Sequence, residues 1–185
     1  MIDEILFEAE LKMDKALEVA KEDFAGIRTG RANTAMFAKL IVDYYGAPTP
    51  LQQLASFQVP EARTVLITPY DKGAMREIEK TLMNSDLGVN PSNNGTVIRA
   101  MLPALTEERR KEYIKLARHK GEEAKVSVRN IRRHAKDDLE KLVKDGEVGE
   151  DDGSRAEKEL EGLTKKHVDT IDVLLKGKES ELMEV

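Results

Sequence analysis

The sequence predicts an α+β protein, in which a long antiparallel three-helix bundle carries a small inserted β/α/β domain. Three observations predict it. Both ends of the 185-residue chain show apolar residues at helical spacing, the middle shows β-branched runs between turn residues, and all six prolines lie in that middle. Charged residues make up 35% and aromatic residues only 4% of the chain, a composition typical of helices with exposed faces and narrow apolar seams.

Residues 2 to about 28 form the first predicted helix. Neither Pro nor Gly interrupts this segment before Gly26. Its apolar residues recur at steps of three and four, which place them on one side of a helix. They are Ile5, Leu6, Ala9, Met13, Ala16, Leu17, Ala20, Phe24 and Ile27.

Residues 31–105 form the predicted β/α/β domain. Three runs rich in β-branched residues predict strands: AKLIVDYYG, RTVLITPYD and TVIRAML. Between the last two, KGAMREIEKTLMNSD predicts a short helix with Met75, Ile78, Leu82 and Met83 on one side. The segment PSNNG (91–95) carries residues typical of a turn before a strand.

Two more helices are predicted after residue 105. Thr106 is placed to cap the first, with Glu107 and Glu108 in its first turn. Its length, roughly 40 residues, corresponds to about 60 Å. A break is expected at DGEVGEDDGS (145–154). The expected seam residues of the two helices are Tyr113, Ala117, Ala124, Val128, Ile131, Ala135, Leu139 and Leu142, then Ala156, Leu160, Leu163, His167, Ile171 and Leu174.

Long helices with narrow seams bury those seams against each other. We therefore expect residues 1–30 and 106–185 to form one discontinuous bundle domain, with residues 31–105 inserted as a second domain. Two chain crossings with Gly and Pro at their ends predict a double-stranded hinge near residues 29–34 and 102–106. The hinge residues are Thr29, Gly30, Arg31, Ala32, Asn33, Thr34, Leu102, Pro103, Ala104, Leu105 and Thr106.

Positive charge is concentrated in residues 109–136, which hold eleven Lys and Arg against three Glu in a chain of net charge −5. Such a concentration is typical of a surface that binds a polyanion. The alternative is that these cations pair with acidic residues of neighbouring helices, since residues 137–185 carry eight basic and sixteen acidic residues. The residues expected to bind are Arg132 first, then Arg129 and Arg133, with Lys125, Lys136, Arg110 and Arg109 beside them.

The mode of binding follows from spacing. Lys125, Arg129, Arg132 and Lys136 lie four, three and four residues apart, each one residue beyond a seam position, so they form one stripe beside the seam. No aromatic residues are interleaved with them, which argues against stacking on single-stranded bases. Contacts to the phosphates and groove shape of structured RNA fit better.

Arg28 and Arg31 flank Thr29 and Gly30, and two interpretations of them stay open. Basic residues and a glycine are typical of a helix C-terminus, and the same two arginines can contact RNA. The segment RTGRA lacks the spaced glycines and the Lys-Ser/Thr pair of a phosphate-binding loop.

The sequence predicts no enzyme, no metal and no cofactor. There is no Cys, and the three histidines share no metal-ligand spacing. GEDDGS spaces its acids wrongly for a calcium loop, and no nucleophile–base pair is evident. The N-terminus lacks the basic region of a secretory signal, and no apolar run approaches the roughly 20 residues of a membrane span. We expect a soluble, cytoplasmic monomer.

Over nearly its full length the chain resembles bacterial ribosome recycling factors. The resemblance is carried, in order and spacing, by RTGRA (28–32), VDYYGAPTPL (42–51), VPEARTVLITPYDK (59–72), SDLGVNPSNNG (85–95), LPALTEERR (102–110) and VRNIRRHAK (128–136). It departs from the family pattern at Thr34, where Pro is frequent, and at Asn94, where Asp is frequent.

The resemblance implies a two-domain, L-shaped molecule that binds the post-termination ribosome. With elongation factor G and GTP it would separate the subunits and release mRNA and tRNA. VRNIRR is similar to the segment by which the family contacts large-subunit rRNA in the inter-subunit region, and Arg28 and Arg31 would lie near the hinge. Two alternatives are a coiled-coil adaptor and a general structured-RNA-binding protein without a partner GTPase.

Overall fold

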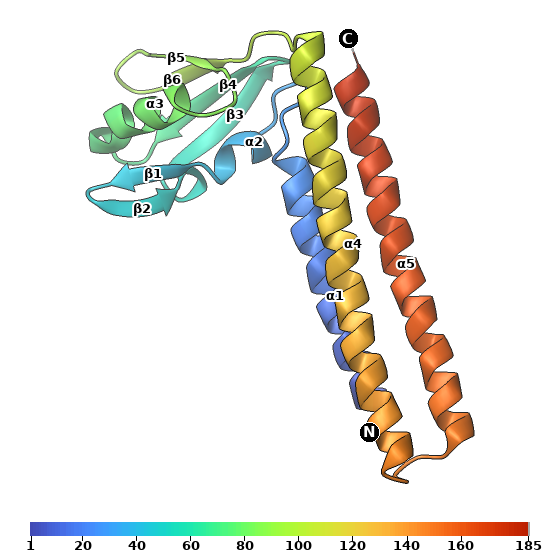
Figure 1. Cartoon of the computed structure of the whole chain (residues 1–185). Helices are drawn as coiled ribbons and strands as arrows, with labels where there is room; N and C mark the ends of the chain where they lie inside the picture. Colours follow the sequence, from blue (N-terminus) through green and yellow to red (C-terminus); the bar gives the residue numbers. More distant parts are fainter. Residues whose placement is uncertain (185) are drawn as a thin grey trace. The chain divides into compact units, whose positions relative to one another are not determined.

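The computed structural model describes residues 1–184 and confirms the α+β class (Figure 1). The chain forms two compact units. The helical unit comprises residues 1–24 and 115–179; the α/β unit comprises residues 25–114 and the segment from Ser180, described to Glu184. The predicted domain boundaries at residues 30 and 105 stay a prediction. Among the described residues, no helix combines the length and apolar character that crossing a membrane requires.

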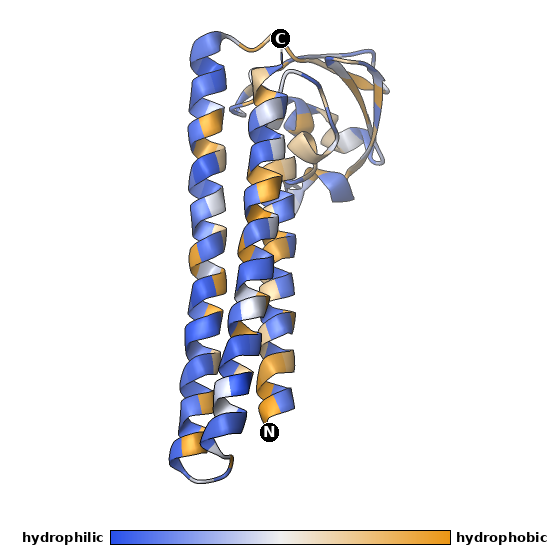
Figure 2. Ribbon diagram, turned by 90° about the vertical axis from the view of Figure 1, so that its right-hand side faces the viewer, coloured by the Kyte–Doolittle hydropathy of each residue, from blue (hydrophilic) through white to orange (hydrophobic). Residues whose placement is uncertain are grey.

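Three long helices build the helical unit: α1 (Ile2–Ala25), α4 (Glu107–Lys144) and α5 (Glu150–Met183). They lie side by side and alternate in direction, α4 running opposite to α1 and α5 (Figure 1). Figure 2 shows hydrophobic residues as short patches along each helix, separated by hydrophilic residues. This pattern is expected when only a narrow stripe of each helix is buried. The predicted antiparallel three-helix bundle is therefore confirmed.

Small residues line much of the seam. Those of α4 include Ala117, Gly121 and Ala124, all buried. A Cβ added at Gly121 would lie 3.2 Å from Leu175 Cδ2, so α5 passes α4 closely at this level. The remaining buried residues of the seam are Leu6, Ala9, Met13, Ala20 and Phe24 of α1, Val128, Ala135 and Leu139 of α4, and Ala156, Leu160, His167, Ile171 and Lys178 of α5.

His167 joins two helices inside the helical unit, as its place in the predicted seam suggests. Its side chain is 3% exposed. Nε2 lies 2.6 Å from Asp14 Oδ1 on α1, and Nδ1 lies 2.7 Å from the carbonyl oxygen of Leu163, one turn earlier on α5. The ring thus bridges α1 and α5 with both of its nitrogens engaged.

The connection between α4 and α5 is shorter than predicted. The sequence predicts a break over residues 145–154, whereas α5 already begins at Glu150. Gly146, at φ +71°, ends α4, with its N–H and that of Glu147 donating to carbonyls of the last turn. The prediction was wrong because acidic residues favour a helix N-terminus, and because Gly153 is a packing residue of α5, with no room for a Cβ against Val143.

The α/β unit contains a four-stranded antiparallel sheet of order β3-β4-β6-β5 and a separate β1-β2 hairpin. The predicted runs become β1, β4 and β6. Three strands, β2, β3 and β5, were not predicted. Both β2 and β5 contain Pro and pair on one side only, a place where Pro is tolerated. The strands are β1 (Ile41–Tyr44), β2 (Ala47–Pro50), β3 (Ala55–Glu61), β4 (Thr64–Pro69), β5 (Asn90–Asn93) and β6 (Ile98–Met101).

Helix α3 (Met75–Met83) packs into a core with the sheet, the hairpin and the short α2 (Ala35–Ala38). Ile78 and Leu82 are fully buried there, and Met75 is 8% exposed. The prediction for Met83 was wrong: it is 69% exposed, because it lies about 100° around the helix from Leu82.

Two side chains act as the turn chemistry suggests. Arg109 N donates to Thr106 Oγ1 at 3.1 Å, so Thr106 caps α4 as predicted. Asn94 Oδ1 accepts from the N–H groups of Thr96 and Val97 at 3.0 and 2.9 Å. An amide oxygen serves this turn as a carboxylate oxygen would, which explains why Asn is suitable at position 94.

Candidate nucleic-acid interface

The predicted basic stripe lies on α4 within the helical unit. Arg129 and Arg133 are exposed, and Arg132 is half-buried beside the seam. The seam residues Val128 and Ile131 precede Arg129 and Arg132 directly, so the bundle fixes the face on which these guanidinium groups lie. Because the backbone of a long packed helix is rigid, the spacing of the three arginines is preset.

Ion pairs divide the stripe into two kinds of cation. Lys125 is 2.5 Å from Asp172 on α5 and 3.3 Å from Glu122, with a side chain only 13% exposed. The hydrogen bond to Asp172 raises the pKa of Lys125 above its ordinary value. Lys136 lies 3.7 Å from Glu140, one turn along α4. The alternative interpretation, pairing with acidic neighbours, therefore describes these two lysines.

The three arginines differ from the lysines. Within residues 1–184, no carboxylate forms an ion pair or hydrogen bond with Arg129, Arg132 or Arg133. Five other basic residues of α4 do have such partners, in the pairs Arg109–Glu112, Lys111–Glu107, Arg118–Glu179, His119–Glu123 and Lys120–Glu123. The arginines thus keep their positive charge available to an external anion.

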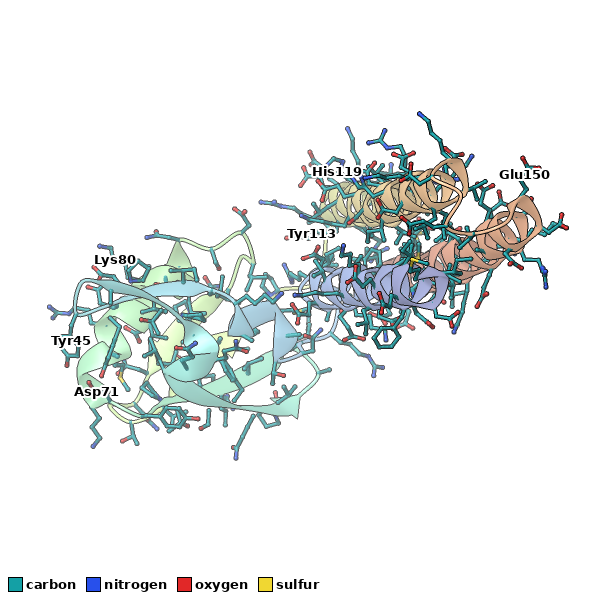
Figure 3. The ribbon with its side chains drawn as sticks, turned by 90° about the horizontal axis from the view of Figure 1, so that it is seen from below. Tyr45, Asp71, Lys80, Tyr113, His119 and Glu150 are labelled. Carbon is teal, nitrogen blue, oxygen red and sulfur yellow. The ribbon has the colours of Figure 1, made fainter. Side chains whose placement is uncertain are left out.

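This arrangement suits phosphate binding. Residues at i, i+3 and i+4 lie on one side of a helix, and a guanidinium group donates in a fork that matches phosphate oxygens. Figure 3 shows His119 also pointing outward from α4, but it is 2.8 Å from Glu123. Among the described residues, no group of His, Asp and Glu is arranged to hold a metal ion.

Arg28 is used inside the α/β unit. It is 5% exposed, its Nη1 donates to the Leu87 carbonyl at 3.0 Å, and its Nη2 donates to the Pro103 carbonyl. Burial lowers the pKa of Arg28 below its ordinary value. Nearby, Tyr113 OH donates to the carbonyl of Asp86 at 3.0 Å. Of the two interpretations of Arg28, the structure favours the structural one, and we leave it out of the proposed RNA surface.

The predicted hinge segments are both bonded to the turn that joins β3 and β4. Ala32 N donates to the Ala62 carbonyl at 2.6 Å, and Leu102 N donates to the Arg63 carbonyl at 2.8 Å. Thr29 is buried, and its hydroxyl donates to the Arg31 carbonyl at 3.0 Å. Whether these segments bend stays a prediction.

A hollow of about 470 Å³ brings two of the predicted arginines together in the α/β unit. Arg31 and Arg110 line it, and Arg63 joins them. Its lining also includes Glu181 and Glu184, so its charge is mixed. Arg63 was not predicted, because it opens a β-branched run whose pattern indicates only a strand.

A second group was also missed. Asp71 Oδ2 accepts from the hydroxyls of Tyr44 and Tyr45 at 2.9 and 3.1 Å, and Asp71 Oδ1 accepts from Gly73 N at 2.8 Å. The bond from Gly73, then that from Tyr44, lowers the pKa of Asp71; the bonds to Asp71 raise the pKa of both tyrosines. Tyr44 and Tyr45 precede Asp71 by 27 and 26 residues, so the local sequence pattern does not indicate the cluster.

Comparison with known proteins identifies the family. Residues 20–183 match the family model described as Ribosome recycling factor. The ribosome-recycling factors of Kineococcus radiotolerans and Paenarthrobacter aurescens are 71% and 70% identical over the full length of both chains. A solution structure of the ribosome recycling factor is 43% identical, with a TM-score of 0.76, and covers 100% of this chain and 98% of that one.

A further solved structure has a TM-score of 0.70, 42% identity and full coverage of both chains. It is described as models for the T. thermophilus ribosome recycling factor and the E. coli elongation factor G bound to the E. coli post-termination complex. The family match spans most of the chain, and the relatives align from end to end. This chain belongs to the ribosome recycling factor family.

Proposed function

We propose that the helical unit binds large-subunit rRNA through Arg129, Arg132 and Arg133, and that this contact holds the chain on the post-termination ribosome. The family places the chain in ribosome recycling. The observation that carries the proposed contact is the contrast on α4: the lysines of the stripe are paired with carboxylates, and within residues 1–184 the three arginines are not.

The partner proteins follow from the relatives. One similar recycling factor was described together with elongation factor G on a post-termination complex. We infer the same assembly for this chain, in the cytoplasm, with GTP hydrolysis performed by the elongation factor. This chain would then contribute binding and geometry but no catalysis. The predicted hinge would let the α/β unit move while the bundle stays docked.

The first experiment measures binding of Arg132→Ala to purified large ribosomal subunits over about 50 to 200 mM salt. One lost phosphate contact should weaken binding roughly five- to tenfold and lower the salt slope by about one. Arg155→Ala is the matched control, because Arg155 is an exposed helical arginine already paired with Asp152 at 2.8 Å. Circular dichroism checks that both variants keep their helices.

The second experiment follows subunit dissociation by light scattering, with elongation factor G and GTP supplied. We expect splitting to need all three components, and to slow in Arg132→Ala in proportion to its weaker binding. Equal binding of Arg132→Ala and Arg155→Ala at every salt concentration would refute the RNA contact. It would leave the family's role intact and return α4 to an internal ion-pairing role.

A further inference from the structure

A groove runs between β1 and α3 on the α/β unit. It consists of two adjoining hollows of about 430 and 270 Å³, and Asp43 and Glu77 line both. Ile41 and Lys80 lie in the larger hollow, and Tyr45 lies in the smaller. Figure 3 shows the labelled Lys80, Tyr45 and Asp71 following one another along one edge of the unit.

Tyr45 is held in place although it is exposed. Tyr45 is 75% exposed, and its backbone adopts the left-handed φ of +49°. Its hydroxyl donates to Asp71 and lies over Gly73, where a Cβ would overlap it. The Tyr44 ring packs against it edge-on, at a centroid distance of 4.7 Å. An aromatic ring fixed in solvent loses little conformational freedom when a partner covers it.

The surroundings of this ring select the partner's chemistry. Tyrosine is enriched in the cores of protein–protein interfaces, and Ile41, 56% exposed, adds apolar surface in the same groove. The smaller hollow is lined by two acidic residues, Asp43 and Glu77, and by no basic one. That charge repels RNA phosphates and attracts Lys or Arg. Lys80 is confined to the other hollow.

We propose that this groove binds a segment of a protein partner that carries Lys or Arg, with the basic side chain between Asp43 and Glu77 and against the face of Tyr45. The groove and the arginines of α4 are different binding surfaces. The groove binds protein, whereas the arginines bind RNA. This inference rests on the proposed function in one respect: it assumes that the partner protein is encountered on the post-termination ribosome.

The test places a photo-reactive p-benzoyl-phenylalanine at Ile41, in the full chain, on post-termination ribosomes with elongation factor G and GTP. A second chain carries the same probe at Asn130, beside Arg129 on α4. We expect the Ile41 probe to cross-link a protein at a Lys- or Arg-containing peptide, and the Asn130 probe to cross-link RNA. Mass spectrometry and nuclease digestion identify the products.

Charge neutralisation then tests the selectivity. Asp43→Asn with Glu77→Gln should lower the Ile41 cross-link roughly tenfold. Asn keeps an oxygen for Gly46 N, which donates to Asp43 at 2.7 Å, so the hairpin turn is preserved. The matched control is Asp86→Asn in the same unit. The backbone carbonyl of Asp86 accepts from Tyr113, and its carboxylate has no hydrogen bond or ion pair within residues 1–184.

Each outcome decides between the two proposals. Three outcomes would overturn the groove proposal alone. In these the Ile41 probe cross-links RNA, or it cross-links a protein equally well after the two neutralisations, or it fails to cross-link while the Asn130 probe reacts. Loss of the Asn130 cross-link with retention of the Ile41 cross-link would overturn the RNA contact alone. No cross-link from either position would overturn both.

Discussion

The helical unit and the α/β unit use charged side chains in opposite ways. In the helical unit the seam is built from small and aliphatic residues, and nearly all cations lie outside it. In the α/β unit a buried guanidinium, Arg28, bonds two backbone carbonyls, and the Asp71 carboxylate bonds two tyrosines and a backbone N–H. Arg129, Arg132 and Arg133 of the bundle, which have no carboxylate partner within residues 1–184, therefore remain available for binding, whereas part of the charge on the α/β unit maintains the fold.

The difference decides which variants are informative. An arginine removed from the outer face of α4 should change binding and leave stability nearly unchanged. A charged residue removed from the α/β unit must first be shown to leave that unit folded. All four tyrosines lie in the α/β unit and the chain has no Trp, so tyrosine fluorescence reports on this unit alone.

The largest effect is expected from Arg28→Ala. It leaves the Leu87 and Pro103 carbonyls without their donor and empties a buried site, which should lower the free energy of unfolding of the α/β unit by about 3 kcal/mol. Urea unfolding followed by tyrosine fluorescence measures it. Arg31→Ala, at an exposed position three residues on, is the control and should change stability by less than about 0.5 kcal/mol. Similar values for the two variants would contradict the structural role of Arg28.

The contrast also explains what sequence reasoning could reach. The bundle helices follow one period, so the seam residues of α1, α4 and α5 and the place of His167 were predictable. The α/β unit was predictable where β-branched runs form β4 and β6. It was not predictable where pairing with another strand decides the structure, as for the Pro-containing strands β2 and β5.

The same distinction applies to the candidate site. Spacing located the stripe on α4, but only the packed helices revealed that Lys125 faces Asp172, 47 residues along the chain. The arginines have no such partner in the part of the chain that the structure describes. Arg28 was open to two interpretations, because a local motif does not record a bond to a carbonyl 75 residues away. Charge pattern thus predicts a surface, and packing decides which of its members remain available.

A pair of glycines in α5 should give smaller effects of opposite sign. A Cβ at Gly153 would overlap Val143, a stiff β-branched residue, so Gly153→Ala should destabilise the helical unit by about 1 kcal/mol. Nothing lies within 4 Å of a Cβ at Gly162, so Gly162→Ala should stabilise it by a little under 1 kcal/mol through helix propensity. Urea unfolding followed by circular dichroism compares them. A stabilising Gly153→Ala would show that the α4–α5 packing is looser than described.

Lys125→Met should cost less still, about 0.5 kcal/mol after allowance for solvent screening, and should leave large-subunit binding unchanged. The folded-state pKa of Lys125 is raised by Asp172, so its contribution is complete below the ordinary value of about 10.4 and is lost as the pH rises through the folded-state value. The stability difference between wild type and Lys125→Met should therefore stay constant up to about pH 10 and shrink as the pH rises further. Binding loss as large as that of Arg132→Ala would place Lys125 in the RNA contact.

The smallest expected effect is a local titration in the α/β unit. The lowered pKa of Asp71 means that its bond to Gly73 is present above the ordinary value of about 3.9 and is lost as the pH falls through the lower folded-state value. The Gly73 amide resonance should shift with a midpoint below about 3.9, and Asp71→Asn should abolish the shift. A midpoint at or above that value would contradict the Tyr44–Tyr45–Asp71 cluster.

The two units also differ in the order in which their parts are synthesised. The core of the α/β unit comes from residues 36–102, one continuous stretch that can fold soon after it is made. Helix α1 is made first, yet its partners in the helical unit begin at residue 115 and extend to residue 179. At about 5–20 residues per second, its apolar stripe waits many seconds for them. A factor that works on ribosomes thus emerges from one with its first helix unpaired, at the stage when a nascent chain most needs protection from aggregation.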